Sequence, residues 1–149
     1  MSLVSTVIAL GPRRWAFLAR VAATAVVVEP VVRLLPLRTA ARLAGARLEL
    51  DATVAGRDAW PELAPADRER CALALRVLGR RPFRATCLRR ALVLATLLRR
   101  HRPALRVGVT KSRGTVAAHA WLELAGATLD PEAAQYRGLA PVRAAAADR

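Results

Sequence analysis

Three side chains in the second half of the chain have the types that a cysteine acyl-transfer site needs. Cys87 is followed by His119 and then by Asp130. A thiolate attacks a carbonyl carbon well, an imidazole can take the thiol's proton, and a carboxylate can orient the imidazole. Each residue alone has a plainer explanation: a buried thiol, a satisfied structural histidine, and a turn residue before Pro131. Together and in this order they predict a thiol–imidazole–carboxylate site.

Residues 87–101 predict an amphipathic helix, because apolar residues recur there at helical spacing with arginines around them. Thr86 is the expected N-cap, so Cys87 would occupy the first helical position. Backbone N–H groups and the helix dipole favour a thiolate there, and Arg89 and Arg90 add positive charge. We therefore predict that Cys87 is reactive, whereas Cys71, inside an apolar helix, is a core residue.

Two predicted strands would position the histidine. Residues 105–111 and 115–124 are rich in β-branched and apolar side chains and are separated by a polar turn. His119 and Trp121 share one face of the second strand. A two-residue Ala-Gly turn after this strand would start a third one and bring Asp130 diagonally across from His119, within hydrogen-bonding reach. A loop of odd length would place Asp130 on the opposite face.

These residues together resemble a known family. Residues 87–94 (CLRRALVL), residues 118–124 (AHAWLEL), Gly126 and Asp130 look like the transglutaminase-like core of the stand-alone lasso-peptide leader peptidases. The resemblance runs from about residue 81 to Asp130. One departure is the alanine at position 91, where such sequences often carry serine, but this position is not catalytic.

The resemblance implies a role for each residue of the triad. Cys87 is the nucleophile, His119 the general base and acid, and Asp130 the residue that orients the imidazole. Papain-type relatives usually carry a side-chain oxyanion donor, commonly glutamine, shortly before the nucleophile. The only glutamine here is Gln135, so the backbone N–H of Cys87 is one expected donor and the second is unassigned.

The resemblance also implies a substrate and partners. The enzyme would cut the leader from a lasso-peptide precursor through a thioester acyl-enzyme that water hydrolyses. The precursor peptide is then the substrate, and a separate small leader-binding protein, a RiPP recognition element, delivers it. An asparagine-synthetase-like lasso cyclase closes the ring afterwards.

Positive charge is concentrated around the proposed nucleophile. The net charge is +14, and residues 66–113 carry 14 Lys and Arg against 2 Asp and Glu, a balance of +12. Such a field attracts nucleic acid, a membrane surface or an acidic peptide. Only 4% of residues are aromatic and no nucleic-acid-binding motif is recognisable, so we expect no nucleic-acid partner.

Two other functions remain open at this stage. One is a transglutaminase-like amide or acyl transferase with the same Cys-His-Asp triad, in which an amine rather than water takes the acyl group. The other is a non-catalytic basic binding module. The triad alone does not separate hydrolysis from aminolysis, because the attack by sulfur is common to both.

The elements that must position the site predict an α+β fold. A helical N-terminal region, residues 1–60, precedes a transglutaminase-like core, residues 61–149, in which the catalytic helix packs on a small antiparallel sheet. The predicted helices outside the catalytic one span residues 13–28, 31–48 and 66–78. Glu29-Pro30 is the expected break between the first two.

We expect no bound metal, no cofactor and no membrane-spanning segment. The two cysteines and two histidines match no usual zinc spacing, so we predict reduced thiols, no metal and no cofactor. Within residues 15–37 the longest uncharged stretch, residues 21–28, is far short of the roughly 20 apolar residues that a membrane span needs. Arg13-Arg14 departs by one residue from the spacing of a twin-arginine signal. We therefore predict no membrane span and a cytoplasmic location.

Overall fold

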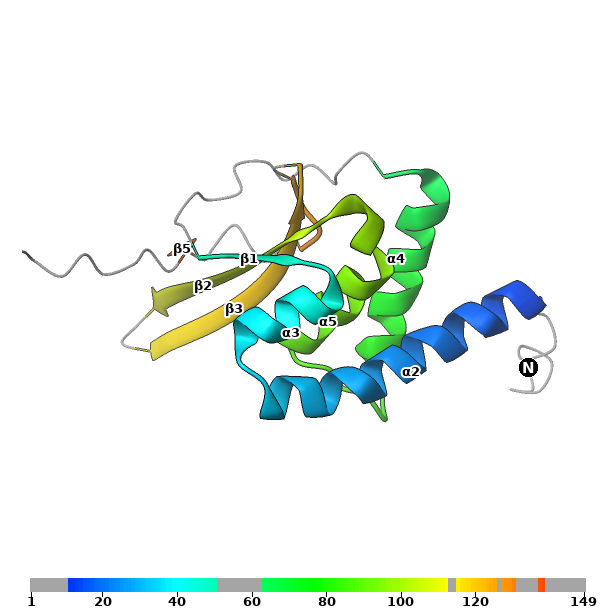
Figure 1. Ribbon diagram of the computed structural model, residues 1–149, viewed down its shortest axis with the longest axis horizontal. Coiled ribbons are helices and arrows are strands. Elements are labelled where there is room, and N and C mark those ends of the chain that lie inside the picture. The colour runs from blue at the N-terminus through cyan, green and yellow to red at the C-terminus, as the bar shows by residue number, and fades with distance from the viewer. Residues whose placement is uncertain (1–10, 51–62, 113–114, 126, 131–136, 139–149) are drawn as a thin grey trace, which may run out of the picture.

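The computed structural model describes residues 11–50, 63–112, 115–125, 127–130 and 137–138. Four α-helices and a small mixed sheet make up this part of the chain, so the predicted α+β class is confirmed. Figure 1 shows helix α5 between the β2–β3 hairpin and helix α2.

Helix α5, Cys87–Leu97, forms the centre of the core. Its middle is buried on all sides, because the five consecutive residues 91–95 are each at most 4% exposed. Strand β3 packs on α5, as do helices α2, α3 and α4. A helix surrounded in this way is apolar all round, and the Ala-Leu-Val-Leu-Ala sequence matches that requirement. The predicted helix extended to residue 101; the observed one ends at Leu97 and a 3₁₀ turn, Arg99–His101, follows.

Helix α2, Pro12–Leu34, is longer than predicted. The expected break at Glu29-Pro30 is wrong, because the helix continues through Pro30. A proline inside a helix leaves the carbonyl four residues earlier without its partner, here that of Val26. Val26 is 66% exposed and Pro30 is also exposed, so water can satisfy that carbonyl. The opposite side of the helix buries Val21 and Val28 against the core.

By length and composition alone, α2 is a helix that could cross a membrane, although two of its residues contribute to the core. The predicted absence of a membrane span stays a prediction. So does the cytoplasmic location.

The predicted helix over residues 31–48 is helical only in part, because the chain leaves the helical conformation at residues 35–36 and again after Ala44. Pro36 precedes a separate short helix α3, Leu37–Ala44, and strand β1, Arg47–Glu49, follows it. Gly45 ends α3 with a φ of +82°, and a Cβ at this position would lie 2.7 Å from the Cβ of Arg99. Glycine is therefore required both by the left-handed backbone and by the close approach of Arg99.

The predicted hairpin is confirmed as strands β2, Ala104–Ser112, and β3, Thr115–Leu124, which pair antiparallel. Strand β4, Ala127–Thr128, pairs antiparallel with β3. The sheet is mixed rather than wholly antiparallel, because β1 pairs parallel with β2. Strand β5, Arg137–Gly138, pairs antiparallel with β2.

Helix α4, Pro65–Leu78, begins one residue before the predicted span, with Pro65 in the first turn. The predicted boundary between residues 60 and 61 lies outside the described residues and stays a prediction. On both sides of it, buried residues contribute to the same core: Val21 and Val28 of α2, Ala40 of α3, and Cys71 of α4.

Candidate active site

Cys87 lies where the sequence places it, at the N-terminus of α5. Thr86 precedes the helix in an extended conformation, and its carbonyl accepts the first helical hydrogen bond, from the N–H of Arg90 at 2.9 Å. The Thr86 side chain forms no capping hydrogen bond, so it is an N-cap by position only. The connection from α4 is fixed by buried Ala85, whose N–H donates to the carbonyl of Leu78 at 2.9 Å. The free thiol of Cys87 is half-buried at this corner.

His119 and Asp130 form a hydrogen-bonded pair, with 2.8 Å between His119 Nε2 and Asp130 Oδ2. The pair depends on the register of β3 and β4, in which Leu124 lies opposite Ala127. The loop between these strands therefore has the predicted even length of two residues. The side chain of His119 is 10% exposed, whereas that of Asp130 is 31% exposed.

Thr128 fixes the position of Asp130 and was missed at the level of sequence. Its Oγ1 accepts a hydrogen bond from the backbone N–H of Asp130 at 3.0 Å. The same hydroxyl lies 3.2 Å from the Asp130 carbonyl, to which it donates. The N–H of Leu129 also donates to the carbonyl of Leu122, at 3.1 Å. The Thr-x-Asp spacing could have predicted this hydrogen bond, because a threonine hydroxyl often bonds the backbone N–H two residues further on.

The indole of Trp121 stacks beside the imidazole of His119, as expected for two residues on the same face of β3. The ring centroids of His119 and Trp121 lie 6.2 Å apart, and the ring planes differ by 19°. Because Nε2 engages Asp130, proton transfer to or from a thiol must use the other ring nitrogen, Nδ1. The indole limits the ways in which the imidazole can turn.

All three predicted residues line one pocket of about 270 Å³. Apolar side chains provide most of its remaining wall: Leu75, Ala91, Leu94, Ala120, Trp121, Leu122 and Leu129. Cys87 comes from the helix and His119 and Asp130 come from the sheet, so packing of α5 on β3 assembles the site. An apolar pocket with a few convergent polar groups is the usual form of a ligand or substrate site.

The sequence profile of the transglutaminase-like superfamily matches residues 31–144, which is most of the chain. The protein belongs to the transglutaminase-like superfamily. No curated protein and no solved structure matches the chain. Transglutaminase-like proteins generally include cysteine proteases and transferases, and this chain has the corresponding type of fold.

Arg89 and Arg90, which follow Cys87 in the first turn of α5, have different environments. Arg89 faces α2, where its guanidinium donates to Glu29 at 2.7 Å, and Glu29 also pairs with Arg33 at 2.6 Å. Arg90 lines the pocket beside Cys87. Glu29 offsets part of the charge of Arg89, so Arg90 is the better placed of the two arginines to stabilise a thiolate at Cys87.

In the part of the chain that the structure describes, no group of three or more His, Cys, Asp or Glu side chains could hold a metal ion. The other cysteine lies well inside the core, where Cys71 is 1% exposed. Burial, together with the nearby carboxylate of Asp67, raises the pKa of the Cys71 thiol from its ordinary 9.0 to about 11. Such a thiol is protonated at neutral pH and is a poor nucleophile.

Proposed function

We propose that this transglutaminase-like protein is a cysteine peptidase that removes the leader peptide from a lasso-peptide precursor. The observation that carries the chemistry is the 2.8 Å His119–Asp130 pair in one pocket with a cysteine at a helix N-terminus. The choice of substrate rests on the resemblance of residues 87–94 and 118–124 to the lasso leader peptidases.

The proposed reaction begins with transfer of the Cys87 thiol proton to Nδ1 of His119. The thiolate attacks the scissile carbonyl carbon, and the carbonyl π electrons move to oxygen. The helix N-terminus stabilises this oxyanion, with the backbone N–H of Cys87 as one donor. The C–N bond then breaks, His119 protonates the departing amine, and a thioester remains on Cys87.

Water completes the cycle in the proposed peptidase. His119 Nδ1 removes a proton from water as its oxygen attacks the thioester carbonyl carbon. The C–S bond breaks, the thiol is restored, and the other half of the peptide leaves as a carboxylic acid. Asp130 holds the ring through Nε2 and stabilises the imidazolium that forms in each half-reaction. The second oxyanion donor stays unassigned.

The partners in this proposal are the precursor peptide, a small leader-binding protein and a lasso cyclase that acts after cleavage. The small size of the pocket supports the proposal of a separate delivery protein. A volume of 270 Å³ accommodates only a few side chains, so a long leader needs further contacts elsewhere. The site is proposed to work without metal or cofactor.

A second candidate is a transglutaminase-like amide or acyl transferase that uses the same triad. The superfamily match favours it equally, because this superfamily includes transferases. The two candidates differ only in whether water or an amine attacks the thioester. A basic binding module without catalysis is the third candidate.

The test is mass spectrometry of a candidate precursor incubated with the protein and a leader-binding partner in ¹⁸O-labelled water. A peptidase releases a leader whose new carboxylate carries ¹⁸O, and a transferase joins an added amine instead. Cys87→Ala should abolish either product. Thr96→Ala, on the same helix but outside the pocket, should retain it. Turnover by Cys87→Ala at the wild-type rate would remove the nucleophile from the proposal.

A further inference from the structure

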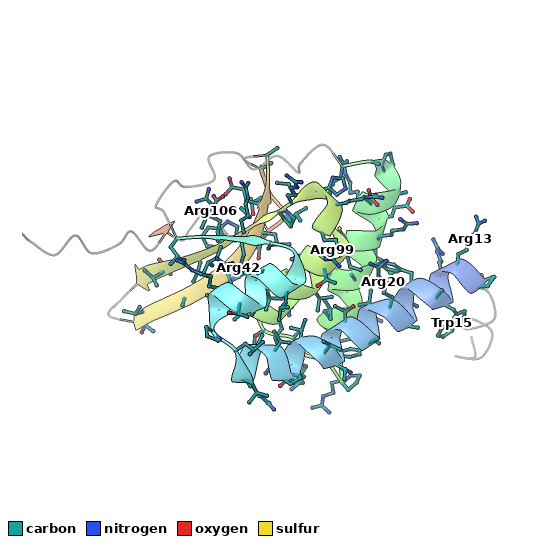
Figure 2. The ribbon with its side chains drawn as sticks, in the orientation of Figure 1. Arg13, Trp15, Arg20, Arg42, Arg99 and Arg106 are labelled. Atoms are coloured by element: carbon teal, nitrogen blue, oxygen red, sulfur yellow. The ribbon has the colours of Figure 1, made fainter. Side chains whose placement is uncertain are left out.

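A second hollow, of about 430 Å³, lies away from Cys87 at the junction of α2, α4 and the end of α5. Five arginines from three elements line it. They are Arg13 and Arg20 of α2, Arg70 of α4, and Arg99 and Arg100 after α5. Figure 2 shows Arg13 and Arg20 along α2 and Arg99 at the adjoining end of α5.

The charge in this hollow is unbalanced. Among the described residues, Asp67 is the one carboxylate that lines it, and Asp67 already pairs with Arg100 and, at 3.5 Å, with Arg70. Burial opposes ionisation of Asp67, but the hydrogen bond and charge of Arg100 and the nearby His101 and Arg70 outweigh it, so the pKa is lowered. Arg13, Arg20 and Arg99 form no ion pair with any carboxylate that the structure describes.

The positive surface continues beyond this hollow. An adjoining hollow of about 540 Å³ shares Arg13, Phe17 and Arg70 with the first. It adds Arg14 and Arg76, with Glu69 as the acidic residue among those described. The combined surface is larger than one small anion requires and suits an extended chain that carries several negative charges.

Helix α5 connects this surface to the proposed active site. Cys87 begins the helix, and Arg99 lies twelve residues further on, which corresponds to about 18 Å along the axis. An extended peptide covers this distance with about six residues. A peptide that occupies both places therefore needs at least about six residues between them.

We infer that the arginine-lined hollow between α2, α4 and the end of α5 binds an acidic segment of the substrate peptide, away from the bond that is cut. This assignment of the occupant rests on the proposed function. Guanidinium groups bind carboxylates through two parallel hydrogen bonds, and the three that no described carboxylate occupies, those of Arg13, Arg20 and Arg99, match a run of Asp or Glu side chains. Sequence-tolerant binding of single-stranded nucleic acid relies on aromatic stacking, and Phe17 is the one aromatic residue among the described lining residues.

The test is fluorescence anisotropy with the Cys87→Ala protein, so that the peptide stays intact. The probe is a labelled peptide with six consecutive glutamates, compared with the same peptide carrying six glutamines, at an ionic strength of about 0.1 M. The glutamate peptide should bind and the glutamine peptide should not. Arg20→Gln with Arg99→Gln should weaken binding about tenfold, because each removes an arginine that no described carboxylate occupies.

A matched pair separates the hollow from the general charge of the protein. Arg38→Gln with Arg42→Gln removes the same charge from exposed positions on α3 and should change affinity less than about twofold. Equal loss in the two pairs, or no binding of the glutamate peptide, would overturn the inference. Tighter binding of a thymidine oligonucleotide at the same arginines would also overturn it, in favour of a nucleic-acid site. Because no cleavage is measured, failure here leaves the peptidase proposal standing, and failure of precursor cleavage leaves the affinity result standing.

Discussion

The two cysteines differ in exposure and in charge surroundings, and the difference is measurable. Cys87 is half-buried at a helix start, whereas Cys71 is 1% exposed inside the core. We predict that iodoacetamide modifies Cys87 first in the native protein and Cys71 only after unfolding, since the thiolate is the species that alkylates. Peptide mapping by mass spectrometry reads the order. Earlier modification of Cys71 would contradict the assignment of the nucleophile.

Cys71 also predicts a loss of stability in alkali. Its pKa is raised on folding, so its contribution to stability is complete below pH 9.0 and declines as the pH rises to about 11. The free energy of unfolding, measured by urea titration, should fall over this range more steeply for the native sequence than for Cys71→Ala. Parallel curves for the two proteins would show that the thiol does not control this decline.

His119 and Asp130 should contribute unequally to the rate. His119→Ala removes the proton acceptor and should slow the chemical step by about 10²–10⁴-fold, as expected for general-base catalysis. Asp130→Asn keeps a hydrogen-bonding partner for Nε2 and should cost less, because its proposed role is to orient and stabilise the ring. Single-turnover kinetics measure both, and wild-type rates in folded His119→Ala would exclude it as the base.

At the α3–β1 turn, Gly45 leaves no room for a single added methyl group. Gly45→Ala should lower the free energy of unfolding by about 2–3 kcal/mol, because it combines a left-handed backbone with a 2.7 Å contact to Arg99. Gly11→Ser is the control: open space surrounds Gly11, which is the N-cap of α2, so its stability should be unchanged or slightly higher. Thermal unfolding of both variants tests this, and an unaffected Gly45→Ala would mean that the α3–β1 turn relaxes freely.

The elements that the sequence predicted well are those with a local signal. Two runs rich in β-branched and apolar residues, separated by a polar turn, predicted the β2–β3 hairpin, and the Thr86-Cys87 boundary followed from capping and helical spacing. Asp130 could be placed near His119 because a β3–β4 loop of even length puts both residues on the same face of the sheet. For the site, sequence therefore located the three groups that the structure brings into one pocket.

The features that sequence missed depend on contacts between distant segments. Strand β1 is three residues long and exists because β2 pairs with it, so no local periodicity distinguishes it from the end of a helix. The passage of α2 through Pro30 depends on which side of the helix the core covers. Likewise, Arg89 and Arg90 have different partners because α2 packs beside Arg89. The local sequence around the two arginines does not predict where α2 lies.

At the scale of the whole molecule, the charge of +14 should act on substrate capture more than on chemistry. Raising the salt concentration from about 0.1 M to about 1 M shortens the Debye length from roughly 10 Å to roughly 3 Å. We expect leader cleavage to slow at limiting substrate, while the single-turnover rate of a preformed complex changes little. Efficient cleavage of leader by the protein alone, unaffected by salt, would contradict both electrostatic capture and delivery by a partner.

Glu29 gives the outer helix α2 a direct connection to the turn that carries Cys87. One carboxylate oxygen, Oε1, forms an ion pair with Arg33 within α2 and accepts a hydrogen bond from Arg89, two residues after the proposed nucleophile. The pair is partly buried and joins segments sixty residues apart in the chain. A molecule that displaces α2 is therefore expected to displace the first turn of α5 as well. The position of the helix start that holds Cys87 thus depends on how α2 is seated, through a contact that lies outside the pocket.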